Sequence, residues 1–329
     1  MAPIRSYRGS IAAALVLLLA ASGLAFAAPA GARGAASSSF NSAFASFPTQ
    51  VTGSYTPLPG DFDCDGSARE IMWYGPGGAP DSFWTVTGLG PGVTKVSTPL
   101  AVNGTYIPFT GDWDNDDCDD IFWYAPGPAK DYVWYFDGPG PAFESVEVSV
   151  NGTYIPTAIA PAPGIGGVFW YAPGAGQEYI WLGGPARGQF SSAPGPTVNG
   201  TDYRPIRLGD LDSGVPGDTM LFHRPGPGTD YVLDKVLFGN QAPISTPVDI
   251  GGTHIPLGVF GDNPVAIMYG PGADPDLLFG PLGAPPPPFG TVAPGTVNGL
   301  YTPAVALSGD FIVWHAPGGA TDYLWIGVT

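Results

Sequence analysis

Residues 102–150 read VNGTYIPFTGDWDNDDCDDIFWYAPGPAKDYVWYFDGPGPAFESVEVSV, and this stretch contains one complete copy of a repeated unit. Four short runs, 106–111, 120–125, 132–136 and 143–150, are rich in β-branched and aromatic residues, and clusters of Gly, Pro, Asn and Asp separate them. Such runs between turn-forming residues are typical of short β-strands. Beyond the first 27 residues no segment sustains an apolar period of 3.6 residues, so we expect almost no helix.

The unit occurs six times, and each copy carries an aromatic-rich anchor that ends in Pro-Gly. The prolines of this anchor are 46 to 52 residues apart: Pro76, Pro126, Pro173, Pro225, Pro271 and Pro317. An acid follows each proline by five residues: Asp81, Asp131, Glu178, Asp230, Asp276 and Asp322. Four short strands at a period near 48 residues are the signature of a propeller blade, so we predict an all-β, six-bladed β-propeller of four-stranded blades.

The repeated positions also predict how the blades are held together. We expect each repeated acid to cap a turn amide, because one occurs in every copy beside a tight turn. The Trp-Tyr pairs of the anchors should pack between blades. His223, His254 and His315 stand where other copies have Tyr, so they should be structural substitutes for that ring.

The last copy stops after its third strand, and a segment before the first copy supplies what is missing. Phe44 precedes Thr52 by eight residues, as Phe143 precedes Asn151, the equivalent turn residue two copies later. We therefore predict that residues 42–51 form the fourth strand of the last blade, which closes the ring and removes an exposed sheet edge.

Three copies have acidic loops between their first and second strands. The second copy places carboxylates at Asp112, Asp114, Asp116 and Asp120, with the main-chain carbonyl of Cys118 between them; the first offers Asp61, Asp63, Asp65 and Glu70; the fourth keeps Asp210, Asp212 and Asp218. Calcium binds six to eight oxygen ligands, and alternate acids on a tight loop turn toward one centre. We predict calcium in these loops; the alternative is a set of solvated acidic turns.

These loops resemble the Gly-Asp-Phe-Asp-x-Asp-Gly loop of the FG-GAP and VCBS repeat family, which includes the integrin α-chain propeller. The matching stretches are 60–66 and 111–116. The resemblance implies β-propeller blades, calcium held by the loop, and a role in extracellular recognition.

The first residues look like an export signal. Arg5 and Arg8 precede an apolar run, and small residues end it at 25–27, so we expect a signal peptide over 1–27, a flexible segment over 28–42 and a single propeller domain over 43–329. No later segment approaches the length of a membrane span, so we expect a secreted, soluble protein. Cleavage would make the formal net charge of −17 more negative, which disfavours nucleic acid and anionic membranes as partners.

The two cysteines, Cys64 and Cys118, lie in the acidic loops of neighbouring copies. An isolated even pair in an oxidising compartment suggests a disulfide, and two separate thiols are the alternative.

The sequence contains no common catalytic motif, so we expect no enzymatic activity. Our leading hypothesis is a monomeric binding or adhesion module for extracellular glycans or proteins. We expect the partner to dock on the connections that follow the third strands. A glycan-cleaving enzyme with catalytic carboxylates and a non-catalytic scaffold subunit are the alternatives.

Overall fold

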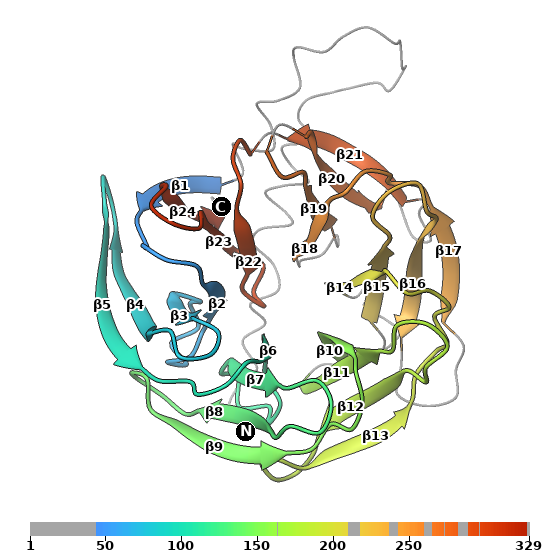
Figure 1. Cartoon of the computed structure of the whole chain (residues 1–329), viewed down its shortest axis with the longest axis horizontal. Helices are drawn as coiled ribbons and strands as arrows, with labels where there is room; N and C mark the ends of the chain where they lie inside the picture. The colour runs from blue at the N-terminus through green and yellow to red at the C-terminus, as the bar shows by residue number, and fades with distance from the viewer. Residues whose placement is uncertain are drawn as a thin grey trace, which may run out of the picture.

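The computed structural model describes residues 44–327, apart from 163, 210–217, 237–242, 260–264, 273, 282–288 and 296. These residues form a six-bladed β-propeller in which every blade is a four-stranded antiparallel sheet (Figure 1). The signal peptide and the flexible segment expected before residue 43 lie outside the described residues. None of the described residues forms a helix long and apolar enough to cross a membrane.

In each blade the four strands lie side by side from the centre of the ring to its rim (Figure 1). Blades one and two consist of β2 (Thr56–Gly60), β3 (Glu70–Tyr74), β4 (Asp81–Leu89) and β5 (Val93–Leu100), then β6 (Ile107–Gly111), β7 (Asp120–Tyr124), β8 (Asp131–Phe136) and β9 (Phe143–Val148). Blades three and four consist of β10 (Ile155–Ala162), β11 (Ile165–Tyr171), β12 (Tyr179–Gly183) and β13 (Phe190–Pro194), then β14 (Arg204–Gly209), β15 (Asp218–His223), β16 (Asp230–Val236) and β17 (Ile244–Val248).

Blade five consists of β18 (Ile255–Val259), β19 (Val265–Tyr269), β20 (Asp276–Pro281) and β21 (Phe289–Gly295). Blade six consists of β22 (Thr302–Val305), β23 (Phe311–His315), β24 (Asp322–Gly327) and β1 (Phe44–Thr49). The first strand of each blade contacts the first strands of both neighbouring blades all the way around, so six blades complete the ring.

Strand β1 confirms the predicted closure of the ring. It pairs antiparallel with β24, from Phe44 opposite Gly327 to Thr49 opposite Asp322, so the start of the domain completes the last blade. The ring of Phe44 stacks on Trp325 at a centroid distance of 5.7 Å. The outer edge of β24 is therefore covered by the chain's own first strand.

The core lies between neighbouring blades, because the second strand of each blade is buried on both faces. In β3, Ile71 and Trp73 pack toward blade six, whereas Met72 and Tyr74 pack toward blade two. This division follows from the two-residue period of a strand, whose successive side chains point to opposite faces. It explains why the second strands are continuous apolar runs in the sequence.

The tyrosine of the anchor fastens each blade to the next one. Tyr74 Oη donates a hydrogen bond to Gly104 O and accepts one from Tyr106 N–H, both at 2.9 Å. Its ring packs edge-on against Trp123 of blade two at 5.1 Å. Tyr124, Tyr171 and Tyr269 donate the equivalent bond in later blades. These contacts confirm the expected packing of the Trp-Tyr pairs between blades.

Histidine replaces this tyrosine in blades four and six, as expected for structural substitution. His315 Nε2 accepts a hydrogen bond from Tyr55 N–H at 3.2 Å, so its Nδ1 carries the proton that bonds Asp322 at 2.8 Å. His223 Nδ1 lies 2.9 Å from Asp230 Oδ1. Both rings are completely buried.

Five of the six repeated acids cap turn amides as predicted, and each also reaches the chain that enters the next blade. Asp131 accepts hydrogen bonds from Ala125 N–H at 2.8 Å and Val150 N–H at 2.7 Å. Glu178 is the exception, because neither of its buried carboxylate oxygens has a hydrogen-bond partner within the described part of the chain. Burial raises the pKa of Glu178.

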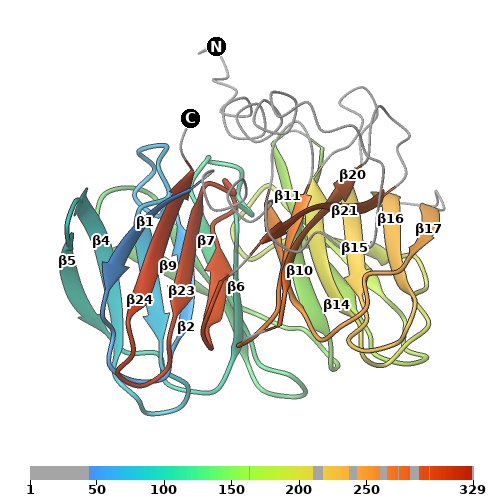
Figure 2. The same ribbon diagram turned by 90° about the horizontal axis from the view of Figure 1, so that it is seen from above.

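The two faces of the ring differ in character (Figure 2). One face, here called the loop face, carries the connections between first and second strands and between third and fourth strands; it is the upper face in Figure 2. The opposite face, here called the turn face, carries the Pro-Gly turns between second and third strands. Because hairpins alternate along an antiparallel sheet, all the acidic loops must lie on the loop face.

Candidate metal centre

The two best acidic loops leave the innermost strands of blades one and two in equivalent positions. Loop one (residues 61–69) follows β2, and loop two (residues 112–119) follows β6. The last predicted ligand of each loop is the first residue of the second strand, since Glu70 pairs with Gly60 and Asp120 pairs with Gly111. The structure therefore confirms that Glu70 and Asp120 are counterparts, although loop one is a residue longer.

Loop one gathers three of its four predicted ligands. Carboxylate oxygens of Asp61, Asp63 and Asp65 lie within 4.8 Å of one another. Asp61 shapes the turn, because it accepts hydrogen bonds from Asp65 N–H at 3.1 Å and Gly66 N–H at 2.8 Å. Gly66 has a φ of 85°, a conformation that glycine adopts without steric cost. The loop thus turns alternate carboxylates toward one centre.

Glu70 lies beneath this group and is 1% exposed. Its Oε2 is buried and has no hydrogen-bond partner. Burial, followed by the charges of Asp63, Asp61 and Asp65, raises the pKa of Glu70 to about 8. A buried carboxylate is costly unless a donor or a cation compensates it. Hard oxygen donors in this number suit calcium, so the residues of loop one fit the ion that the sequence predicts.

Loop two brings together Asp112, Asp114 and Asp120, whose carboxylate oxygens lie within 4.8 Å of one another. Main-chain groups occupy most of these oxygens. Asp112 accepts bonds from Asn115 N–H at 2.7 Å and Asp117 N–H at 3.3 Å, and both oxygens of Asp120 accept main-chain N–H groups. Burial raises the pKa of Asp112 to about 6 and that of Asp120 to about 9.

Arg187, which the sequence reasoning missed, enters loop two from the hairpin between β12 and β13 in blade three. Its Nε donates to Asp114 Oδ2 at 2.7 Å, and its terminal nitrogen lies 3.7 Å from Asp116 Oδ2. It also pairs with Asp137 and Glu144 of the β8–β9 hairpin. Asp116 forms a second carboxylate group with Asp114 and Asp137 instead of joining Asp112 and Asp120. Arg187 is the one basic residue in the β12–β13 connection, a signal that the sequence did contain.

The two loops are joined covalently. Cys64 and Cys118 form a disulfide with a Cα–Cα distance of 4.8 Å, which confirms the predicted bridge. Asp119 adds a reciprocal link, because its N–H donates to Asp61 O and its Oδ2 accepts from Asp61 N–H, both at 2.8 Å. Burial raises the pKa of Asp119 to about 7. Cys118 N–H donates to Asp116 Oδ1 at 3.0 Å, and the proposed role of its carbonyl stays a prediction.

The fourth predicted loop is only partly described. Asp210 and Asp212 lie outside the described residues. Asp218 opens β15, where Arg207 Nε donates to its Oδ1 at 2.8 Å and Ala160 N–H donates to its Oδ2. Its carboxylate is thus an ion-pair partner in this structure, and its role as a metal ligand stays a prediction.

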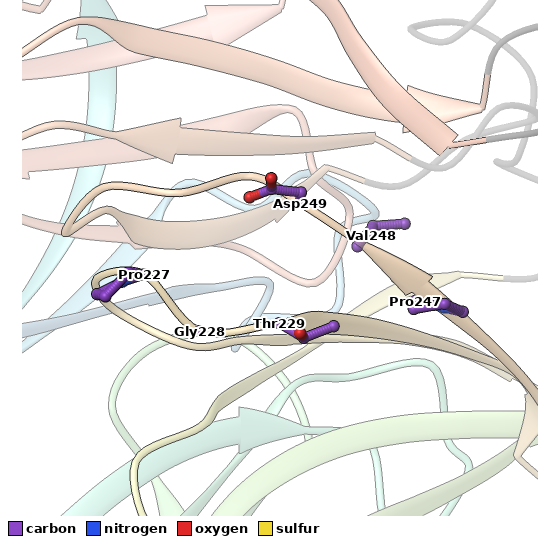
Figure 3. Close-up of a pocket in the computed structure, with 6 residues that line it drawn as sticks. All are labelled: Pro227, Gly228, Thr229, Pro247, Val248 and Asp249. Atoms are coloured by element: carbon purple, nitrogen blue, oxygen red, sulfur yellow. The ribbon is translucent and has the colours of Figure 1, made fainter.

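Surface hollows are shallow in the described parts of the blades. One of about 330 Å³ lies on the turn face between the β15–β16 turn and the end of β17, and it is lined by Pro227, Gly228, Thr229, Pro247, Val248 and Asp249 (Figure 3). Another of about 410 Å³ lies on the loop face beside the β8–β9 hairpin, where Asp137, Pro139, Phe143 and Glu144 are among its lining residues. The second hollow adjoins the carboxylates that bind Arg187.

No protein-family model matches this sequence, and no similar curated protein was found. Among solved structures, the chain is similar to the Dos1 propeller at 9% identity and a TM-score of 0.41, over 78% of this chain and 64% of that one. It is also similar to the WD40 domain of Toxoplasma gondii coronin at 11% identity and a TM-score of 0.43, over 86% of this chain and 87% of that one. Likenesses this weak carry no argument about function, and the resemblance to FG-GAP and VCBS repeats stays a prediction.

Proposed function

We propose that this protein is a secreted calcium-binding β-propeller that acts as a binding or adhesion module for extracellular glycans or proteins. The observation that carries the proposal is Glu70, whose buried Oε2 has no partner and lies beside the carboxylates of loop one. Within the described residues no basic side chain pairs with Asp61, Asp63 or Asp65. A divalent cation would neutralise this group.

Calcium would be held by Asp61, Asp63 and Asp65, with Glu70 completing the carboxylate set below them. The ion would supply charge neutralisation and would fix the conformation of loop one. The Cys64–Cys118 disulfide would carry that rigidity to loop two of the next blade. A disulfide is typical of an oxidising compartment, which supports export of the protein.

The loop face is the proposed docking surface. The ring holds its strands rigidly, so variable connections on one face can present a recognition surface, as loops on rigid scaffolds commonly do. Asp65, Asp116, Asp117 and Asp137 are exposed on this face. Their negative charge favours neutral glycans or cationic protein patches over anionic polymers. We propose binding without chemical change to the partner.

A Glu70→Gln variant tests the calcium site, because the proposal predicts effects of opposite sign with and without metal. In chelator the variant should melt at or above the wild-type temperature, since a buried carboxylate has become a neutral amide. At a hundredfold excess of calcium over its dissociation constant, the wild type should gain ~2.7 kcal/mol and the variant much less. Glu147→Gln, an exposed partner of Lys130, is the matched control and should follow the wild type.

Thermal melts in chelator and in excess calcium measure these differences in stability. Superimposable wild-type curves would show that no structural calcium site exists. The partner is tested separately, by a glycan-array and extracellular-protein screen beside a panel of glycoside hydrolase substrates. Turnover of any glycan that a single carboxylate substitution outside the loops abolished would contradict the binding module.

A further inference from the structure

The most heavily paired basic side chain in the described structure is Arg187. Its guanidinium forms ion pairs with four carboxylates of loop two and the β8–β9 hairpin: Asp114, Asp116, Asp137 and Glu144. Its side chain is only 21% exposed, and it lies over the ring of Tyr135 at 5.0 Å from the centroid. Several partners and an aromatic support hold an arginine far more firmly than a single surface ion pair does.

Loop one has no such cation, although its surroundings are equivalent. In both cases the third strand of the next blade supports the acidic loop: Phe136, at the end of β8, packs on Phe62 of loop one at 4.8 Å. The connection that follows β8 is 137–142, which reads DGPGPA, whereas the connection that follows β12 is 184–189, which reads GPARGQ. The connection over loop two therefore carries a positive charge and the one over loop one carries none. Arg69, the last residue of loop one, forms no ion pair with the described carboxylates.

The oxygens of loop two are already satisfied by the protein. Main-chain N–H groups reach both oxygens of Asp112, as they reach both oxygens of Asp61 in loop one. Loop two differs at its other acids, because both oxygens of Asp120 accept main-chain N–H groups and Asp114 Oδ2 accepts from Arg187, whereas Glu70 Oε2 has no partner. Only Asp114 Oδ1 is buried without a partner in this loop. Calcium needs six to eight oxygen ligands at 2.3–2.6 Å, so it would have to displace the guanidinium to gain Asp114 and Asp116 together.

The blade-three backbone leaves little room for the loop to rearrange. A Cβ placed on Gly166 would meet Asp112 O at 1.6 Å, and one on Gly183 would meet Trp113 O at 2.0 Å. Asn115 Oδ1 also accepts a hydrogen bond from Gly166 N–H at 2.8 Å. Loop two is thus clamped against β11 and β12 in the conformation that pairs with Arg187.

We propose that Arg187 is the built-in counter-cation of loop two and excludes calcium from it, so that of loops one and two only loop one binds calcium. The metal in loop one is the part of this inference that rests on the proposed function. Calcium would rigidify loop one, between β2 and β3 of blade one, whereas the guanidinium ties blade two to blade three with no dependence on metal.

Calcium titration calorimetry on the full mature chain tests the inference. Arg187→Gln should bind one ion more than the wild type, because the oxygens of Asp114 and Asp116 become available. Arg224→Gln is the matched control: it removes the same charge from an exposed ion pair with Asp202 and should bind as many ions as the wild type. Equal numbers of bound ions in the wild type and in Arg187→Gln would overturn the proposal.

A second pair of variants keeps the test decisive if Arg187→Gln folds poorly. Asp114→Asn should leave the number of bound ions unchanged, and Asp63→Asn should lower it by one; loss of an ion in Asp114→Asn would refute the assignment. A wild type that binds no calcium would reject the metal in loop one. In that case a rise from no ion to one in Arg187→Gln would still establish the role of Arg187, and no rise would reject it.

Discussion

Replacing Cys64 and Cys118 by serine removes a crosslink that closes a loop of 54 residues between blades one and two. In the chain-entropy account, such a crosslink restricts the unfolded state and contributes about 4 kcal/mol to the free energy of unfolding. With an unfolding entropy of about 2.1 cal/mol/K per residue over a domain of about 280 residues, its loss should lower Tm by about 7 °C.

The native loops should keep their arrangement in this variant. The two hydrogen bonds between Asp61 and Asp119 do not involve the sulfur atoms, and they hold loop one against loop two at 2.8 Å. The circular dichroism spectrum should therefore be unchanged, and calcium should still stabilise the variant by the same amount as the wild type. The loss of stability would arise because the unfolded chain gains conformational freedom, while the native structure stays the same.

Urea unfolding of the double-serine variant and of the wild type, each with and without reductant, measures the difference. Reductant should destabilise the wild type to the level of the variant and leave the variant unaffected. A loss below about 1 kcal/mol would refute the entropic reasoning. Loss of native structure in the variant would refute the expectation that the two loops keep their arrangement without the disulfide.

Two further predictions concern the ring itself. Deleting residues 44–49 should leave β24 with an unpaired edge and cause self-association, which light scattering would detect; a monomer with an unchanged Tm would contradict the role of β1. Because burial raises the pKa of Glu178, its carboxylate stabilises the fold below the unfolded pKa and loses that contribution as pH rises through the folded pKa. Glu178→Gln should therefore lessen the loss of stability as pH rises above the ordinary pKa of glutamate, and thermal melts over that pH range measure it. A pH dependence equal to that of the wild type would refute the role of Glu178. Asp131→Asn, which breaks one of two main-chain bonds, should cost ~1–3 kcal/mol in the free energy of unfolding at neutral pH.

The architecture could be predicted from the sequence because the same short motifs recur in each blade. Turn residues, the Pro-Gly anchor and an acid five residues later recur at fixed spacing, so the six blades, the closing strand and the caps followed from one pattern. The disulfide was predictable because Cys64 and Cys118 occupy related loops of adjacent copies.

The partners of loop two could not be predicted in the same way. Arg187 lies 73 residues from Asp114, and their contact depends on how far the β12–β13 hairpin leans over the preceding blade. Repeat spacing fixes which blades are neighbours, but not the reach of one long side chain. The missing hydrogen bonds of Glu178 could not be predicted for a related reason. Glu has one more methylene than Asp, which changes the reach of the side chain but leaves the spacing of the repeat unchanged.

The sharing of blade six between the two ends of the domain has a consequence for biogenesis. Five blades are made of strands that are consecutive in the chain, so each can assemble from neighbouring hairpins as it is synthesised. Strand β1 is translated first, yet its partner β24 is translated last. The order of synthesis therefore leaves an open-ring intermediate with a free strand and a free edge, and such species are prone to aggregate. Final assembly should depend on keeping that first strand available until the whole domain has been made.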